Sequence, residues 1–290
     1  MPHQPVCVAD CKAVLGEGPV WVASEGALYW LDIKGRRLFR RAFADGAVTS
    51  WETPFRIGSI APRAKGGFVA GTDRGFAWVE PDQGRFEPFA HPEREHPTNR
   101  FNDGKLDRAG RFWAGTMDDE EQRASGALYR LDPDLAWERI DEEYKVTNGP
   151  AFSPDGRVLY HNDSARQLIY AFDLDAAGRV GERRILARFG EGDGYPDGMT
   201  VDAEGCLWVA FWDGWCLRRL SPAGEMIATL DLAVQRPTSC AFGGPALDHL
   251  FVTSASIGLG DAELAGQPQA GGVFMLRPGV VGLADIPFRG

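Results

Sequence analysis

Residues 195–199 read Tyr-Pro-Asp-Gly-Met, and this stretch introduces an apolar run, a turn and a second, more apolar run. The same order, with an oxygen-bearing side chain before a glycine, occurs at three other places: Glu17-Gly18, Asp103-Gly104 and Asn148-Gly149. Each place is typical of the first strand of a repeated antiparallel sheet. If the repeats close into a ring, these side chains meet on its axis. Three carboxylates there would repel one another without a cation, and oxygen ligands suit a hard or borderline divalent cation.

A second repeated phrase sets the spacing. A turn residue followed by a short apolar run occurs six times, at Gly26–Trp30, Gly66–Ala70, Gly110–Ala114, Gly156–Tyr160, Gly205–Val209 and Asp248–Val252. The first residues of these copies are separated by 40, 44, 46, 49 and 43 positions. This is the length of a four-stranded propeller blade. Further runs lie before and after each copy, with weak fourth runs such as residues 47–53 and 184–187.

The spacing predicts an all-β fold, a single six-bladed β-propeller with a central metal site over residues 1–290. Its inner strands are expected to start near Glu17, Ile57, Asp103, Asn148, Asp197 and Thr238. Residues 4–10, with a strand over Val6–Asp10, precede the first blade and are expected to pair into the last one, which removes two sheet edges. Two long connections, Gly115–Ser125 and Ile257–Gly271, are expected at the rims, where loops carry binding residues.

Composition excludes several classes of partner. The chain has 36 Gly, 19 Pro and a formal net charge of -10, so it is rich in turns and lacks the basic balance that nucleic acid or an anionic membrane requires. Its five cysteines include no C-x-x-C pair and indicate reduced thiols in a cytoplasmic protein. No basic-then-apolar leader and no window of about 18 apolar residues is present, so we expect neither export nor membrane anchoring.

Residues before the second Asp-Gly-type pair add a guanidinium and an amide. In the run Asn99–Gly104, alternation along a strand would send Arg100 and Asn102 to one side and Phe101 to the other. Arg100 could bind a ligand, or it could only neutralise neighbouring acids, and the two roles are compatible. Asp-Gly and Asn-Gly are also ordinary turn pairs, but their equivalence across blades favours a polar site on the axis.

Other catalytic classes lack their signatures. The sequence contains no G-x-S-x-G elbow, no H-E-x-x-H and no glycine-rich phosphate loop, and its five histidines show no metal-ligand spacing. Serine-histidine-aspartate hydrolases and histidine-zinc enzymes are therefore disfavoured.

Four motifs in order resemble the SMP-30/gluconolactonase/luciferin-regenerating enzyme family over nearly the whole length. They are Leu15–Trp21, Asn99–Lys105 with Trp113–Met117, Asn148–Ser153 and Pro196–Met199. The resemblance implies a six-bladed propeller that holds one divalent cation, with ligands at Glu17, Asn148 and Asp197.

The resemblance also implies roles for individual residues. Arg100, Asn102 and Glu120 would contact the substrate, and Asp197 would act as general acid or base. The position of Glu120 depends on the register of four consecutive acids, Asp118–Glu121. Because a carboxylate bound to a cation is a poor base, Asp103 beside the ligands could share the proton transfer.

We therefore expect a metal-dependent hydrolase that opens a sugar-derived lactone to its aldonic acid, of the gluconolactonase, xylonolactonase or arabinolactonase type. The cation would be Ca²⁺, Zn²⁺, Mn²⁺, Mg²⁺ or Fe²⁺, and the protein a monomer or small homo-oligomer whose partner is a small lactone. Two alternatives remain open: hydrolysis of another ester, such as an aryl lactone or organophosphate, and a non-catalytic propeller that binds calcium or a metabolite.

Overall fold

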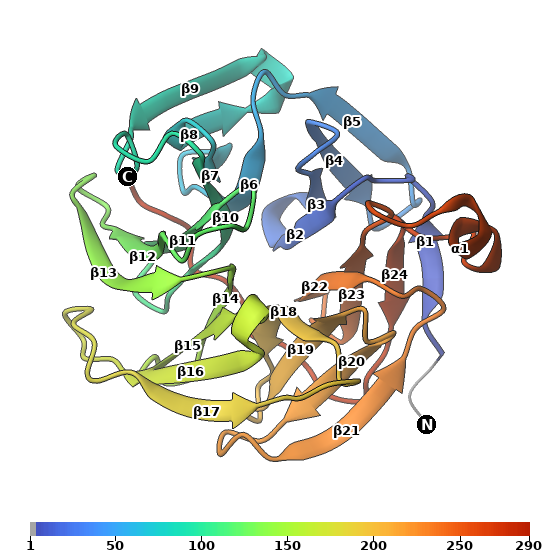
Figure 1. Cartoon of the computed structure of the whole chain (residues 1–290). Coiled ribbons are helices and arrows are strands. Elements are labelled where there is room, and N and C mark those ends of the chain that lie inside the picture. The colour runs from blue at the N-terminus through green and yellow to red at the C-terminus, as the bar shows by residue number, and fades with distance from the viewer. Residues whose placement is uncertain (1–3) are drawn as a thin grey trace. The chain divides into compact units, whose positions relative to one another are not determined.

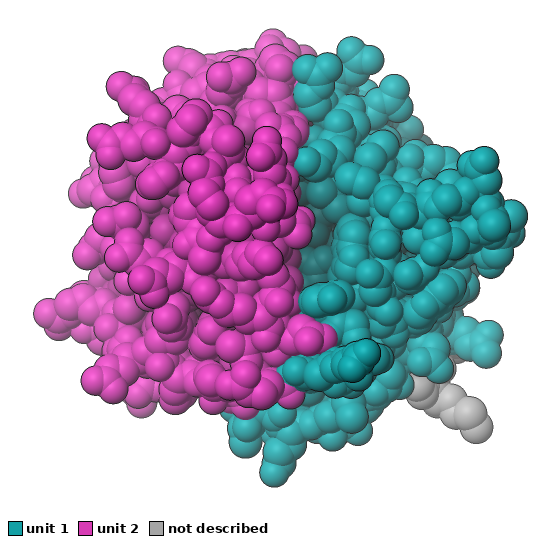
Figure 2. Space-filling view, viewed as in Figure 1, with its two compact units in different colours: residues 1–52, 189–284 teal, residues 53–188, 285–290 magenta. Residues whose placement is uncertain are grey.

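The computed structural model describes residues 4–290, so the first three residues of the predicted domain 1–290 lie outside the described residues. Six four-stranded antiparallel sheets contain the strands, and the fold class is the predicted six-bladed β-propeller. The chain divides into two compact units, which Figure 2 colours separately. Unit 1 comprises residues 1–52 and 189–284, and unit 2 comprises residues 53–188 and 285–290.

Unit 1 contains blades one, five and six (Figure 1). Blade one consists of β2 (Gly16–Val22), β3 (Ala27–Asp32), β4 (Arg37–Ala42) and β5 (Val48–Glu52), with the 3₁₀ turn η1 (Ala23–Glu25) after β2. Blade five consists of β18 (Tyr195–Val201), β19 (Leu207–Trp212), β20 (Cys216–Leu220) and β21 (Met226–Asp231). Blade six consists of β22 (Pro237–Gly243), β23 (His249–Ser254), β24 (Val273–Leu276) and β1 (Val6–Ala9), with α1 (Asp261–Gly266) between β23 and β24.

Unit 2 contains blades two, three and four. Blade two consists of β6 (Ile57–Pro62), β7 (Phe68–Thr72), β8 (Gly75–Glu80) and β9 (Arg85–Ala90), with η2 (Pro81–Gln83) before β9. Blade three consists of β10 (Asn99–Leu106), β11 (Phe112–Asp118), β12 (Gly126–Leu131) and β13 (Trp137–Tyr144). Blade four consists of β14 (Thr147–Phe152), β15 (Val158–Asp163), β16 (Leu168–Asp173) and β17 (Arg184–Arg188), with η3 (Ser164–Arg166) after β15.

Blade six takes its outer strand from the beginning of the chain. β1 pairs antiparallel with β24, with Val6 opposite Met275 and Cys7 opposite Phe274. Ala9 at the end of β1 is buried in an apolar cluster that includes Trp21 and Phe251. The two ends of the sequence of unit 1 therefore share one sheet and one core.

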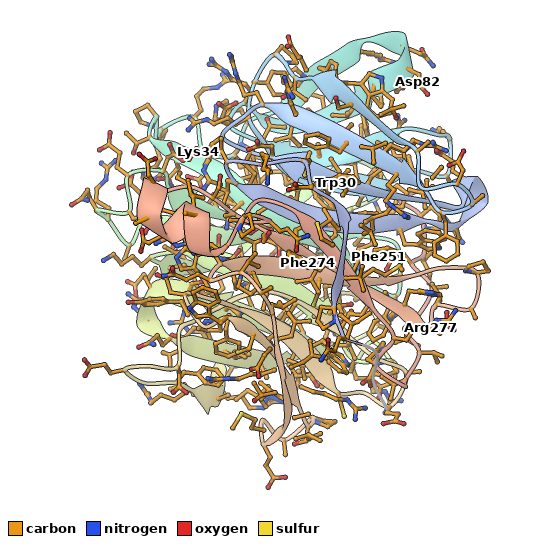
Figure 3. All side chains as sticks on the ribbon, turned by 90° about the vertical axis from the view of Figure 1, so that its right-hand side faces the viewer. Trp30, Lys34, Asp82, Phe251, Phe274 and Arg277 are labelled. Atoms are coloured by element: carbon orange, nitrogen blue, oxygen red, sulfur yellow. The ribbon has the colours of Figure 1, made fainter. Side chains whose placement is uncertain are left out.

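Inner and middle strands carry the core, whereas outer strands face solvent. Every residue of β3 is buried, but β21 is almost entirely exposed. In unit 1, Trp30, Phe251 and Phe274 project from β3, β23 and β24 into the core (Figure 3). Full burial of a large apolar side chain contributes about 1.5–3 kcal/mol. The six apolar phrases of the sequence therefore coincide with the second strand of each blade.

All six inner strands have an irregular register at the positions singled out in the sequence. The shifts lie between Glu17 and Val20, Ile57 and Ser59, Phe101 and Gly104, Asn148 and Ala151, Pro196 and Met199, and Pro237 and Ser239. β10 begins at Asn99, earlier than predicted, because Asn99 already pairs with Asp118 before the bulge that contains Asp103. Bulges re-aim side chains and recur beside functional sites.

Helix is scarce among residues 4–290. It comprises α1 and three 3₁₀ turns, and none of these segments has the length and apolar character needed to cross a membrane.

Candidate functional site

In unit 2, the side chains of Arg100, Asn102 and Asn148 form a buried row on the adjacent inner strands β10 and β14. Asn102 Nδ2 donates to the Oδ1 of Asn148 at 2.9 Å and to the carbonyl oxygen of Thr147 at 2.7 Å. Asn148 Nδ2 donates to the hydroxyl of Ser164 at 2.9 Å. Both amides are at most 6% exposed. These contacts orient the two amides and turn the oxygen of Asn148 toward Asn102.

Asp103 connects the same two strands through backbone amides. Its Oδ1 accepts the N–H of Gly104 at 2.7 Å, and its Oδ2 accepts the N–H of Gly149, next to Asn148, at 3.1 Å. Burial raises the pKa of the Asp103 carboxyl above its ordinary value. The carboxylate therefore fixes the backbone beside Asn148, and its suggested share in proton transfer stays a prediction.

Arg100 lies at the end of the row, with one edge of its guanidinium engaged. Its Nη1 donates to Asn102 Oδ1 at 2.6 Å and to the carbonyl oxygen of Phe101 at 3.1 Å. Its Nε donates to Asp119 Oδ1 at 2.5 Å. Nη2 donates to no other residue in the described part of the chain. Arg100 thus does pair with an acid, and it retains a free edge for a ligand.

The loop after β11 places Asp119, not Glu120, against Arg100. Glu120 is exposed in a turn in which the N–H of Glu121 donates to the carbonyl oxygen of Asp118, and Glu121 has a φ of 55°. The Asp118 Oδ2 accepts backbone N–H groups from Gln122 and Arg123. Sequence reasoning did not single out Asp119. Its adjacency to Glu120 in an acidic run was the only available signal.

In unit 1, two carboxylates lie buried on inner strands that flank β22. Glu17 on β2 is 4% exposed, and Asp197 on β18 is 5% exposed. β22 packs against both strands, and its Thr238 hydroxyl donates to the carbonyl oxygen of Gly16 at 2.5 Å. Glu17 Oε2 accepts the N–H of Gly18 at 2.9 Å.

One glycine in each unit allows two neighbouring inner strands to approach closely. In unit 1, a Cβ on Gly198 would lie 2.1 Å from the Ser239 hydroxyl oxygen. In unit 2, a Cβ on Gly58 would lie 2.4 Å from the carbonyl oxygen of Phe101 and 2.5 Å from that of Asn102. Both contacts are too short for any other residue type. The Gly after Asp197 therefore has a packing reason, independent of any turn.

The predicted ligands fit a divalent cation by residue type. Glu17 and Asp197 in unit 1 each carry a carboxylate, and Asn148 in unit 2 carries an amide oxygen; all three residues are nearly excluded from solvent. Burial of a carboxylate is costly unless it is paired or binds a metal. Oxygen donors of this kind match calcium, magnesium, manganese or zinc.

A second acidic group, in blade five, belongs to a turn. Asp202, Glu204 and Cys206 bring their donor atoms within 4.8 Å of one another. The Asp202 Oδ1 accepts the N–H of Glu204 at 3.0 Å and of Cys206 at 2.9 Å. Its Oδ2 accepts Trp208 Nε1 and Arg219 Nε, both at 2.9 Å. Four donors already engage this carboxylate.

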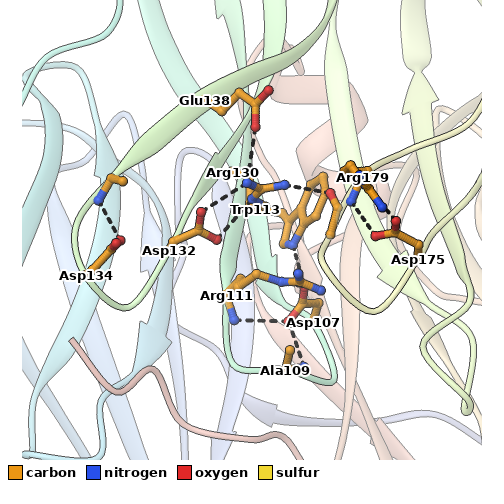
Figure 4. A network of polar contacts seen from close by, with 12 residues as sticks. Asp107, Ala109, Arg111, Trp113, Arg130, Asp132, Asp134, Glu138, Asp175 and Arg179 are labelled. Carbon is orange, nitrogen blue, oxygen red and sulfur yellow. Dashed lines mark hydrogen bonds and ion pairs between the residues drawn. The ribbon is translucent and has the colours of Figure 1, made fainter.

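Blade three repeats this turn with Asp107 (Figure 4). The Asp107 Oδ1 accepts the N–H of Ala109 at 2.8 Å and of Arg111 at 3.0 Å. Its Oδ2 accepts Trp113 Nε1 at 2.9 Å and Arg111 Nε at 2.5 Å. The recurrence in a second blade confirms that the motif belongs to the fold.

A cleft of about 710 Å³ in blade four does not serve the candidate site. Residues 155–158 and 173–176 line it. Asp155 accepts the Ser153 hydroxyl and the N–H of Arg157, and Asp175 pairs with Arg179 at 2.8 Å. Its acids are therefore committed to turns and surface ion pairs.

Comparison with known proteins identifies the family. The family model described as "SMP-30/Gluconolactonase/LRE-like region" matches residues 15–256. The chain belongs to the SMP-30/gluconolactonase/LRE-like family. The resemblance drawn from the four sequence motifs is thereby confirmed.

Relatives within the SMP-30/gluconolactonase/LRE-like family carry two kinds of name. A 6-deoxy-6-sulfogluconolactonase of Pseudomonas putida is 38% identical over 285 residues, which is 98% of each chain. Regucalcin of Gallus gallus is 38% identical over 292 residues, again 98% of each. The solved structure of a calcium-binding protein, regucalcin, from Agrobacterium tumefaciens superposes with a TM-score of 0.94 at 27% identity, over 100% of this chain and 98% of that one.

Proposed function

We propose that this chain is a metal-dependent lactonase that hydrolyses a sugar-derived lactone to the corresponding aldonic acid. The buried row of Arg100, Asn102 and Asn148 carries the proposal, because it combines a guanidinium edge with oriented amides. Such groups suit a polyol ester better than an apolar substrate. The relative named as a sugar lactonase supports the same reaction class.

The proposed metal ligands are Glu17, Asn148 and Asp197, the residues that the repeats of the sequence make equivalent. A bound divalent cation would polarise the lactone carbonyl and lower the pKa of a bound water. The relatives and the solved structure named regucalcin support a calcium-type site.

Arg100 and Asn102 would bind the substrate through the atoms that protein contacts leave available. The free Nη2 of Arg100 can donate to the carbonyl oxygen and stabilise the negative charge that develops on it. Both Nδ2 protons of Asn102 are used by Thr147 and Asn148. Its Oδ1, which accepts Arg100, has a second lone pair that can accept from a substrate hydroxyl. The exposed Glu120 would contact hydroxyls farther out.

Asp197 is the proposed general acid and base. It would take a proton from the water that attacks the carbonyl carbon and deliver it to the ring oxygen when the ester C–O bond breaks. If metal ligation makes Asp197 too weak a base, Asp103, whose pKa burial raises, would accept the proton in its place.

A second candidate function is non-catalytic binding of calcium, as in the calcium-binding protein whose structure this chain resembles. Hydrolysis of an aryl lactone or organophosphate is the other alternative. A pH-drop assay over aldonolactones, aryl lactones and organophosphates, with and without chelator and with metal analysis, separates the three.

Asp197→Asn tests both parts of the proposed role. The change keeps an oxygen but removes one negative charge, so we expect weaker metal binding with the fold intact. At saturating metal, activity should remain about 10²-fold below wild type, which is typical of a lost general base. Activity is measured against metal concentration, and Asp231→Asn, an exposed position in the same blade, is the control.

Full recovery of Asp197→Asn at high metal would reduce Asp197 to a ligand. Wild-type turnover that survives complete metal removal would refute metal dependence. Calcium binding without turnover of any ester would favour the second candidate function.

Arg100→Ala tests the substrate-binding row separately. We expect a lower kcat/KM and unchanged metal stoichiometry, because Arg100 is proposed to bind the lactone and not the metal. Loss of metal together with the side chain would contradict this role.

A further inference from the structure

The carboxylate of Asp119 lies between two guanidinium groups in unit 2. Its Oδ1 accepts Arg100 Nε at 2.5 Å, and its Oδ2 accepts Arg56 Nη1 at 2.5 Å. The Arg100 side chain is 5% exposed and that of Asp119 is 19% exposed. Charge-assisted hydrogen bonds in partly buried surroundings are stronger than surface ion pairs.

Both flanks of Asp119 are fixed in turn. Arg56 Nε donates to Asp73 Oδ2 at 3.1 Å, and the N–H of Asp73 donates back to the carbonyl oxygen of Arg56 at 3.0 Å. The N–H of Asp119 donates to the carbonyl oxygen of Thr98 at 3.0 Å. The carboxylate is therefore held by backbone and by ion pairs, and it cannot follow Arg100 freely.

Asp119 determines which edge of Arg100 stays available. With Nε bound to Asp119 and Nη1 bound to Asn102 and Phe101, the remaining donor is Nη2. No neighbouring acid replaces Asp119 in this role, since the Asp118 Oδ2 accepts backbone N–H groups and Glu120 is exposed.

Charge points to the class of lactone. Among the partly buried side chains, Asp73 and Asp119 carry two negative charges, and Arg56 and Arg100 carry two positive charges, so these four have no net charge among themselves. Arg74, whose Nε lies 3.9 Å from Asp73 Oδ1, is 68% exposed, so solvent screens its charge. A sulfonate or carboxylate on the substrate therefore finds no surplus cation among the partly buried side chains of this cluster. Loss of the Asp119 charge would leave one.

We propose that Asp119, braced by Arg56, positions Arg100 for the substrate and favours a neutral lactone over one that carries an anionic substituent. This proposal rests on the proposed lactonase function and on the role of Arg100 in it. Asp119 acts through Arg100 and is not itself a catalytic residue.

A double-mutant cycle in the full-length protein tests the proposal. Wild type, Asp119→Asn, Arg100→Ala and the double variant are assayed with a neutral aldonolactone and with the same lactone bearing a C6 sulfonate. Asp132→Asn is the matched control, because it removes one charge from the Arg130 ion pair elsewhere in unit 2. Metal content and Tm are recorded for each variant.

We expect Asp119→Asn to lower kcat/KM for the neutral lactone about 10-fold, within the range of couplings between contacting residues. The ratio of kcat/KM for sulfonated over neutral lactone should rise several-fold. In the Arg100→Ala background, Asp119→Asn should cause no further loss. Asp132→Asn should leave both kinetic readouts unchanged.

A loss from Asp119→Asn that is as large in the Arg100→Ala background as in wild type would overturn the proposal, and so would an unchanged ratio between the two lactones. Turnover of neither lactone by the wild-type protein would overturn the proposed function together with this inference. The wild-type rate therefore distinguishes the two failures.

Discussion

At the scale of single residues, His161 is a buried histidine whose surroundings disfavour the protonated imidazole. The side chain is fully buried on β15, its ring is stacked on Tyr144 at a centroid distance of 4.7 Å, and its Nδ1 lies 3.1 Å from the carbonyl oxygen of Asn162. Its Nε2 has no hydrogen-bond partner among residues 4–290. Burial, with a smaller effect of Arg183, lowers the pKa of His161 to about 3.

His161 should make the protein sensitive to mild acid. The folded pKa lies below the pKa of about 6.5 for histidine in an unfolded chain, so only the unfolded state binds the proton between these values. The contribution of neutral His161 to the free energy of unfolding is fully present above pH 6.5. It is lost as pH falls toward 3, by up to about 1.4 kcal/mol per pH unit. His161→Asn should remove this part of the slope in urea unfolding between pH 6.5 and 4.

His96→Asn, at an exposed position, is the control substitution for this measurement. An equal slope in wild type and His161→Asn would show that His161 has the same pKa in the folded and unfolded states, and would contradict this prediction.

The sequence predicted which residues form the row more successfully than it predicted their contacts. The sequence singled out Arg100, Asn102 and Asn148, and the structure brings these three into one row. It could not separate Asp119 from Glu120, since the direction of each side chain depends on the backbone of one turn. Nor could it show that both oxygens of Asp103 accept backbone N–H groups, because one of these comes from another blade.

At the scale of elements, one aspartate organises the turn that precedes the second strand in blades three and five. In each blade it accepts two backbone N–H groups and the indole N–H of the tryptophan six residues later. The turn thereby fixes the start of a strand that is otherwise defined only by its apolar side chains.

Asp202→Ala should destabilise the protein without affecting metal content. The change leaves the N–H of Cys206 and the indole N–H of Trp208 buried without an acceptor, which costs roughly 2–4 kcal/mol. The measurements are urea unfolding and metal analysis. Glu204→Ala is the control, and it should cost less than about 1 kcal/mol because it removes only a surface ion pair. A parallel loss of metal in both variants would instead identify a cation site at this turn.

Strands could be predicted where apolar residues in the sequence distinguish buried side chains from exposed ones. The apolar phrases predicted all six second strands, but only three outer strands were singled out, at β1 and near β5 and β17. β13 is mostly charged and exposed, so it has no alternation to detect. The helix α1 spans six residues, which is too short for a helical period, and the inner-strand bulges depend on pairing with a partner strand.

At the scale of the whole molecule, the blade number followed from the six copies of the apolar phrase, whereas the division into two units could not be predicted. Unit 1 combines the first 52 residues with residues 189–284, and no composition shift marks its boundaries. Contacts between segments this distant in sequence are invisible to local patterns.

Removal of residues 1–10 should destabilise unit 1 and expose a sheet edge. β24 would lose its partner, and the cluster around Trp21 and Phe251 would lose Ala9 and Val8. We expect a lower Tm and concentration-dependent association, because an uncovered edge strand pairs with other chains. Calorimetry and light scattering at two protein concentrations measure both effects. An unchanged Tm would mean that β1 contributes nothing to the stability of blade six.

The pairing of β1 with β24 also sets an order of events during synthesis. Val6 leaves the ribosome before its partner Met275, which lies 269 positions later in the chain (275 − 6). At about 5–20 residues per second, β1 waits roughly 15 to 55 seconds for β24 to be translated. Throughout that interval the nascent chain carries an unpaired strand, so translation speed and chaperone access, more than the final stability, should govern the yield of folded protein in the cell.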